Sequence, residues 1–222
     1  SIRHCVGESS MISVLSSGRK IESTGFGGTV IGVAQTNVKR MLAYSSIAHG
    51  GYLLVALVSA NEAGKGAVIF YLAAYAVSNL GAFGVIGLLE NARSNDKVAD
   101  YAGLWGSHPG LAALMTIFLL SLGGFPPLGG FIAKWYVFTA AIQAGYTWLA
   151  IIGVLTSVVS VFFYLRLIVM MYMTPGKDQA ALPAVPRIAG AALVVSAVII
   201  LYLGLLPAQL IDWAAASVRT IF

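Results

Sequence analysis

The segment Gly123-Gly124-Phe125-Pro126-Pro127-Leu128-Gly129-Gly130 interrupts a long apolar stretch that runs from residue 110 to residue 144. One helix needs about 20 apolar residues to cross a bilayer, so a stretch of this length must tilt strongly or be broken. The two prolines lack backbone donors and clash with the preceding turn, while the flanking glycines let the chain change direction. We therefore predict two half-helices joined by a break near residues 123–130.

Lys134 follows this break, inside the second apolar half of the stretch. Helix geometry places it near the middle of the bilayer, where an ionisable side chain costs roughly 3 kcal/mol to insert and faces a partner or a watery path. Broken backbone at this depth persists only where protein or a wet cavity satisfies its carbonyls, and such helices mark ion sites in transporters. A lysine near a helix end can instead extend to the surface, but the apolar residues after Lys134 disfavour this. We interpret Lys134 as part of a path for ions or protons.

The composition independently indicates a membrane protein. Hydrophobic residues make up 59% of the chain, charged residues make up 9%, and the mean hydropathy is +0.87. Soluble domains carry about 25% charged residues. The sequence thus predicts an all-α, polytopic transmembrane bundle whose spans lie at about 41–60, 66–89, 110–144, 147–173 and 187–206.

Both ends of the chain differ from this predicted bundle of residues 29–206. Residues 1–28 are polar and lack helical or strand periodicity, so we expect them to be disordered or foreign to the fold. The apolar residues 24–35 are too few to cross a membrane alone. Residues 207–222 form a short amphipathic tail.

Basic residues near the spans predict the orientation in the bilayer. One side carries Lys39, Arg40, Arg93, Lys97, Lys177 and Arg187, and the other carries Lys65 and Arg219. Cytoplasmic loops hold the excess of Lys and Arg, so we expect the first side to face the cytoplasm and the C-terminus to lie outside. The net charge of +5 therefore needs no nucleic-acid partner, and the lipid bilayer is the expected surrounding.

Other polar residues inside the spans could extend a path from Lys134. His49 lies near mid-membrane, where a histidine can relay protons or bond two helices, and the sequence favours neither. Tyr71, Tyr75 and Asn79 recur at every fourth position and are predicted to share one helix face. They could hold ordered water, although bonds to neighbouring helices are the simpler explanation.

The remaining polar residues suggest ordinary roles and no second chemistry. Lys39 lies beside Arg40 at the cytoplasmic mouth, as the orientation rule requires, and Arg166 is expected to extend to the surface or bind a carbonyl. The sequence has no phosphate-binding glycine loop, no Cys/His metal spacing and no nucleophile with a base. We therefore expect no catalytic residue, redox cofactor or metal in this chain.

Three motifs in order closely resemble the antiporter-like membrane subunits of respiratory complex I, the NADH-quinone oxidoreductase. They occupy residues 35–52, which end in His49-Gly50-Gly51-Tyr52, residues 71–84, and residues 122–134 with the broken helix. The resemblance extends from about Val30 to Phe222 and is closest to subunit N, because subunits L and M tend to have ionisable residues on the face of Tyr71.

The resemblance implies a subunit of two inverted repeats, of which this chain is the C-terminal portion, the second repeat. It implies proton translocation coupled to quinone reduction, with Lys134 as the lysine of the broken twelfth helix and Lys39 and His49 at polar positions of the tenth. NADH, FMN, iron-sulfur clusters and quinone are then expected elsewhere in the complex, other membrane subunits are the partners, and the bacterial inner membrane is the location.

Two departures keep alternatives open. The sequence holds no counterpart of the first repeat, and residues 1–28 do not resemble the ninth helix, as in a truncated or frame-shifted copy. The alternatives are a subunit of a multisubunit cation/proton antiporter or membrane-bound hydrogenase, and a non-conducting scaffold fragment.

Overall fold

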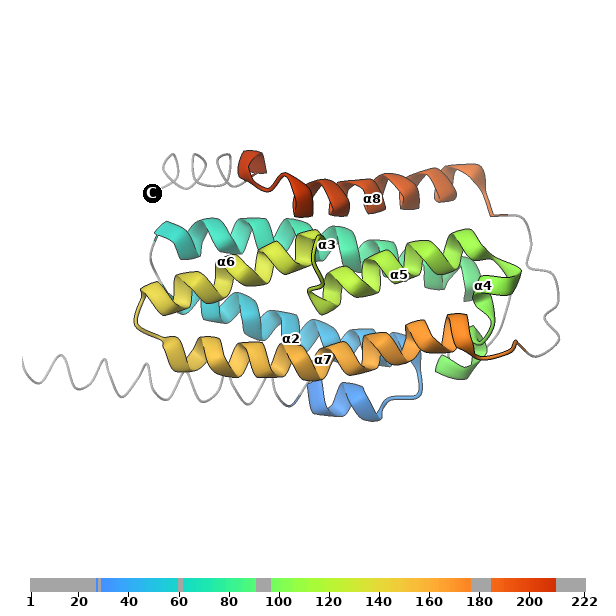
Figure 1. The fold of residues 1–222 in the computed structure, drawn as a ribbon, viewed down its shortest axis with the longest axis horizontal. Helices are drawn as coiled ribbons and strands as arrows, with labels where there is room; N and C mark the ends of the chain where they lie inside the picture. The colour runs from blue at the N-terminus through green and yellow to red at the C-terminus, as the bar shows by residue number, and fades with distance from the viewer. Residues whose placement is uncertain (1–26, 28, 60–61, 91–96, 177–184, 211–222) are drawn as a thin grey trace, which may run out of the picture.

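The computed structural model describes residues 27, 29–59, 62–90, 97–176 and 185–210. The regular elements of this part are helices, which confirms the predicted all-α fold (Figure 1). They are α2 (Val38–Ser59), α3 (Glu62–Glu90), η1 (Val98–Tyr101), α4 (Leu104–Ser107), α5 (Pro109–Gly123), α6 (Gly129–Gln143), α7 (Thr147–Met173) and α8 (Arg187–Leu205). Residues 29–34 are also helical and precede α2.

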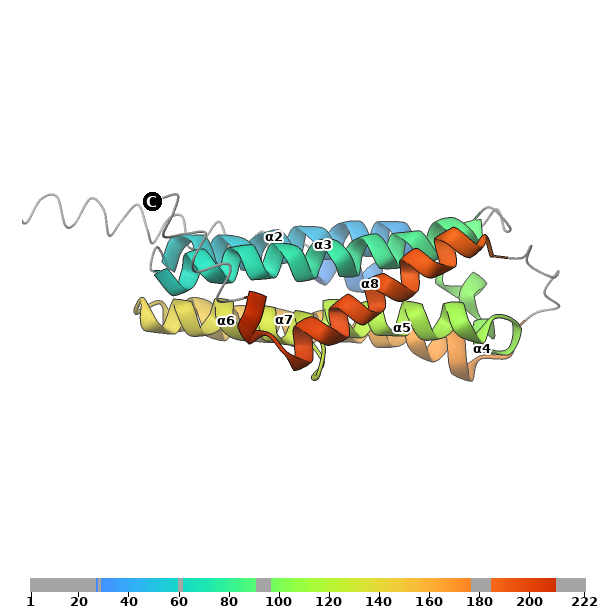
Figure 2. The same ribbon diagram turned by 90° about the horizontal axis from the view of Figure 1, so that it is seen from above.

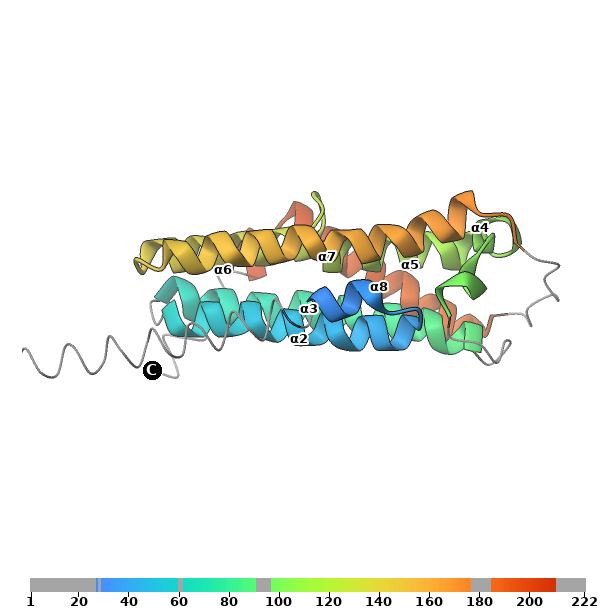
Figure 3. The ribbon, with the colours of Figure 1, turned by 90° about the horizontal axis from the view of Figure 1, so that it is seen from below.

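The long helices form two layers that run along one common axis. Helices α2 and α3 make one layer and the succession α5, α6 and α7 makes the other (Figures 2 and 3). Helix α8 crosses obliquely over one side and packs against α3, α5 and α6. Each layer therefore presents one face to the other, and the side chains between them are shielded.

Four helices of the described residues are long and apolar enough to cross a membrane, namely α2, α3, α7 and α8. Helices α5 and α6 have 15 residues each, or about 22 Å, and lie end to end along the bundle (Figure 1). Together they run the length of the bundle as two half-helices, so the prediction of one broken helix is confirmed. The other predicted spans, 41–60, 66–89, 147–173 and 187–206, correspond to α2, α3, α7 and α8.

The break between α5 and α6 is built by glycine and proline at defined positions. Gly124 adopts a left-handed conformation with φ of 86°, and its N–H donates to the carbonyls of Leu120 and Ser121. Helices commonly end with a residue in this left-handed conformation, which glycine adopts most easily. The Pro126–Pro127 bond is cis. The N–H of Gly130, in the first turn of α6, donates to Ser121 Oγ at 3.2 Å, so the end of one half-helix holds the start of the next.

The buried core consists of two apolar clusters, one toward each end of the bundle. One cluster joins the first turns of α2 to α5 and the later turns of α3 and α7, and the other joins α6 to the opposite halves of α2, α3 and α7. A polar layer lies between them. Its buried members are Ser45, His49, Ser78, Ser121, Lys134, Thr156 and Ser160.

The basic residues that predicted the orientation lie at the two ends of the bundle where the structure describes them. Lys39, Arg40, Lys97 and Arg187 lie at the end where α2 and α8 begin, and Lys65 lies at the opposite end, where α3 begins. Arg93, Lys177 and Arg219 fall outside the described residues. So do the predicted N-terminal segment 1–28, except Gly27, and the predicted tail from residue 211 onward.

Candidate functional site

Lys134 lies in the polar layer with its amine directed at the break in its own span. The side chain is 6% exposed. Nζ donates to the carbonyls of Leu122 at 3.1 Å and Gly123 at 2.9 Å, and to Ser157 Oγ at 2.7 Å. An ammonium has three donors, and all three have an acceptor here. These three acceptors, called here the seat of Lys134, therefore satisfy the hydrogen bonds of a charged lysine inside the bundle.

The end of α5 at Gly123 and the proline pair that follows together leave these two carbonyls available. In an α-helix each carbonyl accepts from the N–H four residues later. The residues four positions after Leu122 and Gly123 are Pro126 and Pro127, which have no N–H to give. The carbonyl end of a helix also carries partial negative charge, which favours a cation there. The sequence of the break thus creates an acceptor site that Lys134 fills.

His49 forms a second node of the polar layer, held between three helices. Its Nδ1 lies 2.6 Å from the hydroxyl of Tyr71 on α3, and its Nε2 lies 3.3 Å from the hydroxyl of Tyr164 on α7. The ring packs on Tyr75 with centroids 4.8 Å apart. The Tyr164 hydroxyl is also hydrogen-bonded to Ser45. Both ring nitrogens therefore have hydroxyl partners that can either donate or accept.

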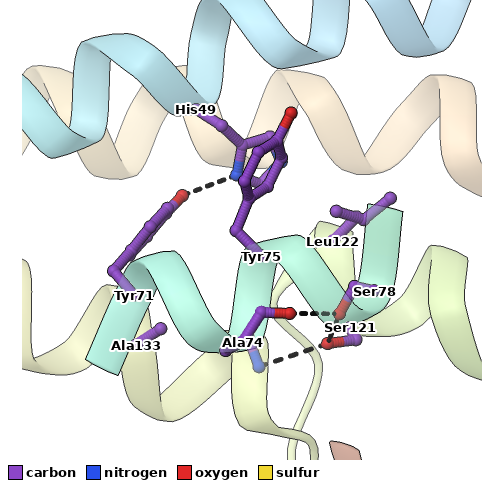
Figure 4. Close-up of a pocket in the computed structure, with 9 residues that line it drawn as sticks. His49, Tyr71, Ala74, Tyr75, Ser78, Ser121, Leu122 and Ala133 are labelled. Carbon is purple, nitrogen blue, oxygen red and sulfur yellow. Dashed lines mark hydrogen bonds between the residues drawn. The ribbon is translucent and has the colours of Figure 1, made fainter. Parts of the chain in front are cut away.

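A small cavity separates His49 from the break. Its volume is about 10 Å³, and a cavity of about this size holds one water. Figure 4 shows His49 on one wall and Ser121 on another, with Tyr71 and Tyr75 pointing toward the histidine. The lining residues are His49, Tyr71, Ala74, Tyr75, Ser78, Ser121, Leu122, Gly130 and Ala133.

Tyr52 contacts both Lys134 and His49. Lys134 Nζ lies 5.3 Å from the centre of the Tyr52 ring, within the range of a cation–π contact, and the His49 ring meets Tyr52 edge-on at 5.7 Å. The Tyr52 hydroxyl is buried near Ser157 and Ser160 and forms no hydrogen bond with the described residues. The arrangement brings amine, imidazole and hydroxyl groups together in one enclosed region.

A sequence model described as the NADH:quinone oxidoreductase/Mrp antiporter transmembrane family matches residues 21–160. The chain belongs to this family. NADH-quinone oxidoreductase subunit N of Trichlorobacter lovleyi is 47% identical over 195 residues, which cover 87% of this chain and 40% of that protein. The chain thus spans less than half the length of this curated relative. Together with the four apolar helices, the family makes it a multi-pass membrane protein.

Solved structures agree with this assignment. Respiratory complex I from Thermus thermophilus with bound aureothin contains a chain that matches with a TM-score of 0.72 and 32% identity, covering 88% of this chain and 44% of that one. A chain of the Mrp complex from Dietzia matches with a TM-score of 0.81 at 20% identity, covering 91% and 46%. The second likeness shows the shared fold alone.

In this member of the NADH:quinone oxidoreductase/Mrp antiporter family, only some of the predicted polar residues come together. His49, Tyr71 and Tyr75 line the cavity, and Tyr52 contacts both His49 and Lys134. Asn79 is half-buried and does not line the cavity, where Ser78 stands instead. A step of seven residues returns within about 20° of the same helix face, whereas eight residues depart by about 80°. The predicted line of Tyr71, Tyr75 and Asn79 therefore turns away from the cavity at its third member.

Lys39 and Arg166 lie away from this group. Lys39 forms an ion pair with Glu90 at 2.5 Å, and both side chains are partly exposed at the bundle end. Arg166 Nη1 donates to the carbonyls of Val33 and Gln35 at 3.4 Å each, in keeping with the predicted carbonyl partner. No three His, Cys, Asp or Glu side chains gather into a metal site within the described residues.

Sequence reasoning did not single out Ser157, Tyr52, Tyr164 or Ser121. Serine and tyrosine are common in membrane spans, and the rotation of α2, α5 and α7 about their axes decides that these four face the polar layer. One pattern could have indicated two of them: Ser157 and Tyr164 are seven residues apart and hence share a face of α7.

Proposed function

We propose that this chain conducts protons as part of a subunit-N-type protein in the membrane arm of an NADH-quinone oxidoreductase. Lys134 is the central group, and its seat on the two freed carbonyls is the observation that carries the proposal. His49, with Tyr71 and Tyr75 across a cavity large enough for water, extends the path on one side. Lys39 marks the cytoplasmic mouth of the same helix.

The chemistry suits proton transfer because the polar side chains near Lys134 either hold a proton or pass one. Lysine and histidine gain and lose protons, and hydroxyl groups accept one proton while releasing another. Lys134 would alternate between charged and neutral as nearby charge changes, with quinone reduction elsewhere in the complex as the drive. NADH, FMN, iron-sulfur clusters and quinone would be carried by other subunits, and other membrane subunits would be its partners.

The proposed location is the bacterial inner membrane, with Lys39 and Arg187 on the cytoplasmic side and the C-terminus on the periplasmic side. The excess of basic residues at one end of the bundle supports this orientation. The rival function is cation/proton antiport, because an Mrp complex shares the fold. Lys134 itself occupies the freed carbonyls, so these oxygens offer no seat for a metal cation while the amine is in place.

The deciding experiment replaces Lys134 by Met in the assembled complex. Inverted membrane vesicles are energised with NADH, and proton uptake and NADH oxidation are recorded together. We expect Lys134→Met to abolish most proton uptake per NADH oxidised, because methionine fills the space without carrying a proton. Lys97→Met, at an exposed position of the bundle end, is the matched control and should pump normally. An unchanged proton-to-electron ratio in Lys134→Met would refute the proposal.

A further inference from the structure

The three acceptors around Lys134 Nζ are chemically unequal. The carbonyls of Leu122 and Gly123 can only accept a hydrogen bond, whereas the hydroxyl of Ser157 can accept one and donate another. A carbonyl oxygen that receives a proton has no other proton to release. Of these three neighbours, only the serine can therefore pass a proton onward.

The hydroxyl also suits both charge states of the lysine. The charged amine donates to Ser157 Oγ at 2.7 Å, and the neutral amine can accept from the same hydroxyl after it rotates. Neither carbonyl can make this reversal. Neutral lysine keeps two N–H donors, which is enough for the two carbonyls that the prolines leave without a backbone donor.

We propose that Ser157 is the relay residue through which Lys134 exchanges its proton. This inference rests on the proposed function and names the next group in the path. The Nζ–H bond that faces Ser157 breaks as a new O–H bond forms on Oγ, and the original hydroxyl proton passes to the next oxygen, that of Tyr52 or of a water beside it. Water is the final acceptor, no electrons move, and the products are a neutral lysine and an unchanged serine.

The surroundings of Ser157 supply the next oxygens. The buried Tyr52 hydroxyl lies near both Ser157 and Ser160 and closes no hydrogen bond in the described part of the chain, so it can take up a new one. Ser160 Oγ in turn lies 3.5 Å from Thr29 Oγ1. These groups come from α2, α7 and residues 29–34. They form a branch from Lys134 that is separate from the cavity lined by His49.

The test compares two variants at one position in the assembled complex. Ser157→Ala removes the hydroxyl, and Ser157→Thr keeps a hydroxyl on the same helix face. We expect Ser157→Ala to slow NADH-driven proton uptake on the order of tenfold, less than the about 100-fold cost of losing a full acid–base group, because water can replace the hydroxyl in part. Ser157→Thr should recover most of the lost rate. Ser196→Ala, which removes an exposed hydroxyl bonded only within α8, should pump normally.

A second readout separates relay from mere support of the lysine. The ratio of pumping rates in H₂O and D₂O should rise in Ser157→Ala, because proton transfer at this step then limits the rate, and should return to normal in Ser157→Thr. Equal pumping in Ser157→Ala and the unaltered complex would overturn the inference, as would an equal loss in the Ala and Thr variants. If Lys134→Met also pumps normally, the proposed function fails; if it does not pump while Ser157→Ala pumps fully, only the relay fails.

Discussion

Lys134 shows how a charged side chain can be kept inside an apolar bundle. An ionised group away from water is costly unless its hydrogen bonds are complete. Here the carbonyls of Leu122 and Gly123 accept from two of the three Lys134 N–H donors, and Ser157 Oγ accepts from the third. Removing either side leaves the other unsatisfied, so the proline pair and the lysine form one functional unit.

Gly124 allows a test of how closely this unit is fitted. A Cβ at Gly124 would lie 2.9 Å from Lys134 Cδ and 3.2 Å from its Nζ, whereas a Cβ at Gly145 would have no described atom within 4 Å. Both glycines are left-handed, with φ of 86° and 85°. Either substitution by Ala should therefore cost about 1–2 kcal/mol of stability through backbone strain.

Only Gly124→Ala should also displace the amine. A misplacement of about 1 Å can lower a rate by about 100-fold, so we expect proton uptake to fall strongly in Gly124→Ala and to stay normal in Gly145→Ala. Thermal unfolding in detergent checks that the two variants lose similar stability. Equal pumping in both would contradict the fitted seat.

These residues also mark the limit of what the sequence could predict. The break and Lys134 were predictable, because prolines act on their own helix and a lysine is rare at membrane depth. Ser157 and Tyr52 were not, because their roles depend on how α7 and α2 rotate against α6. Asn79 lost its predicted place to Ser78 for the same reason, since a small difference in helix phase decides which neighbour faces the cavity.

At the scale of elements, the joint between α5 and α6 is held from a third helix. Ser121 Oγ accepts from the N–H of Gly130 at 3.2 Å and lies 2.8 Å from Ser78 Oγ on α3. A Cβ on Gly130 would collide with the Ser121 carbonyl, so the two half-helices approach as closely as glycine permits. One serine thus links both halves of the broken span to α3.

Ser121→Ala should loosen this joint. It leaves the Gly130 N–H without its acceptor, while the Ser78 hydroxyl loses Ser121 but keeps the Ala74 carbonyl. A buried group that loses its partner costs about 1–3 kcal/mol. We expect a clear drop in the unfolding midpoint in detergent micelles. Ser196→Ala should change the free energy of unfolding by less than about 0.5 kcal/mol, as exposed substitutions do. Similar shifts in the two variants would show that Ser121 does not support the break.

At the scale of the whole molecule, stability and proton chemistry are assigned to different regions of the bundle. The two apolar clusters stabilise each end of the bundle, while the break, Lys134 and His49 share the middle, where the bilayer would otherwise exclude water. The alternation of apolar spans predicted this architecture, because span length and composition are local properties. The pairing of helices into two layers needed the structure.

The orientation of the bundle is the remaining test at this scale. With Cys5 replaced by Ser, a single cysteine is introduced at Arg187 or at Thr147, exposed positions at opposite ends of the bundle. The excess of basic residues beside Arg187 predicts that its end faces the cytoplasm. In intact spheroplasts a membrane-impermeant maleimide should label Thr147→Cys and spare Arg187→Cys, and permeabilisation should expose both. Labelling of Arg187→Cys alone in intact spheroplasts would reverse the orientation, and with it the direction in which Lys134 and Ser157 deliver protons.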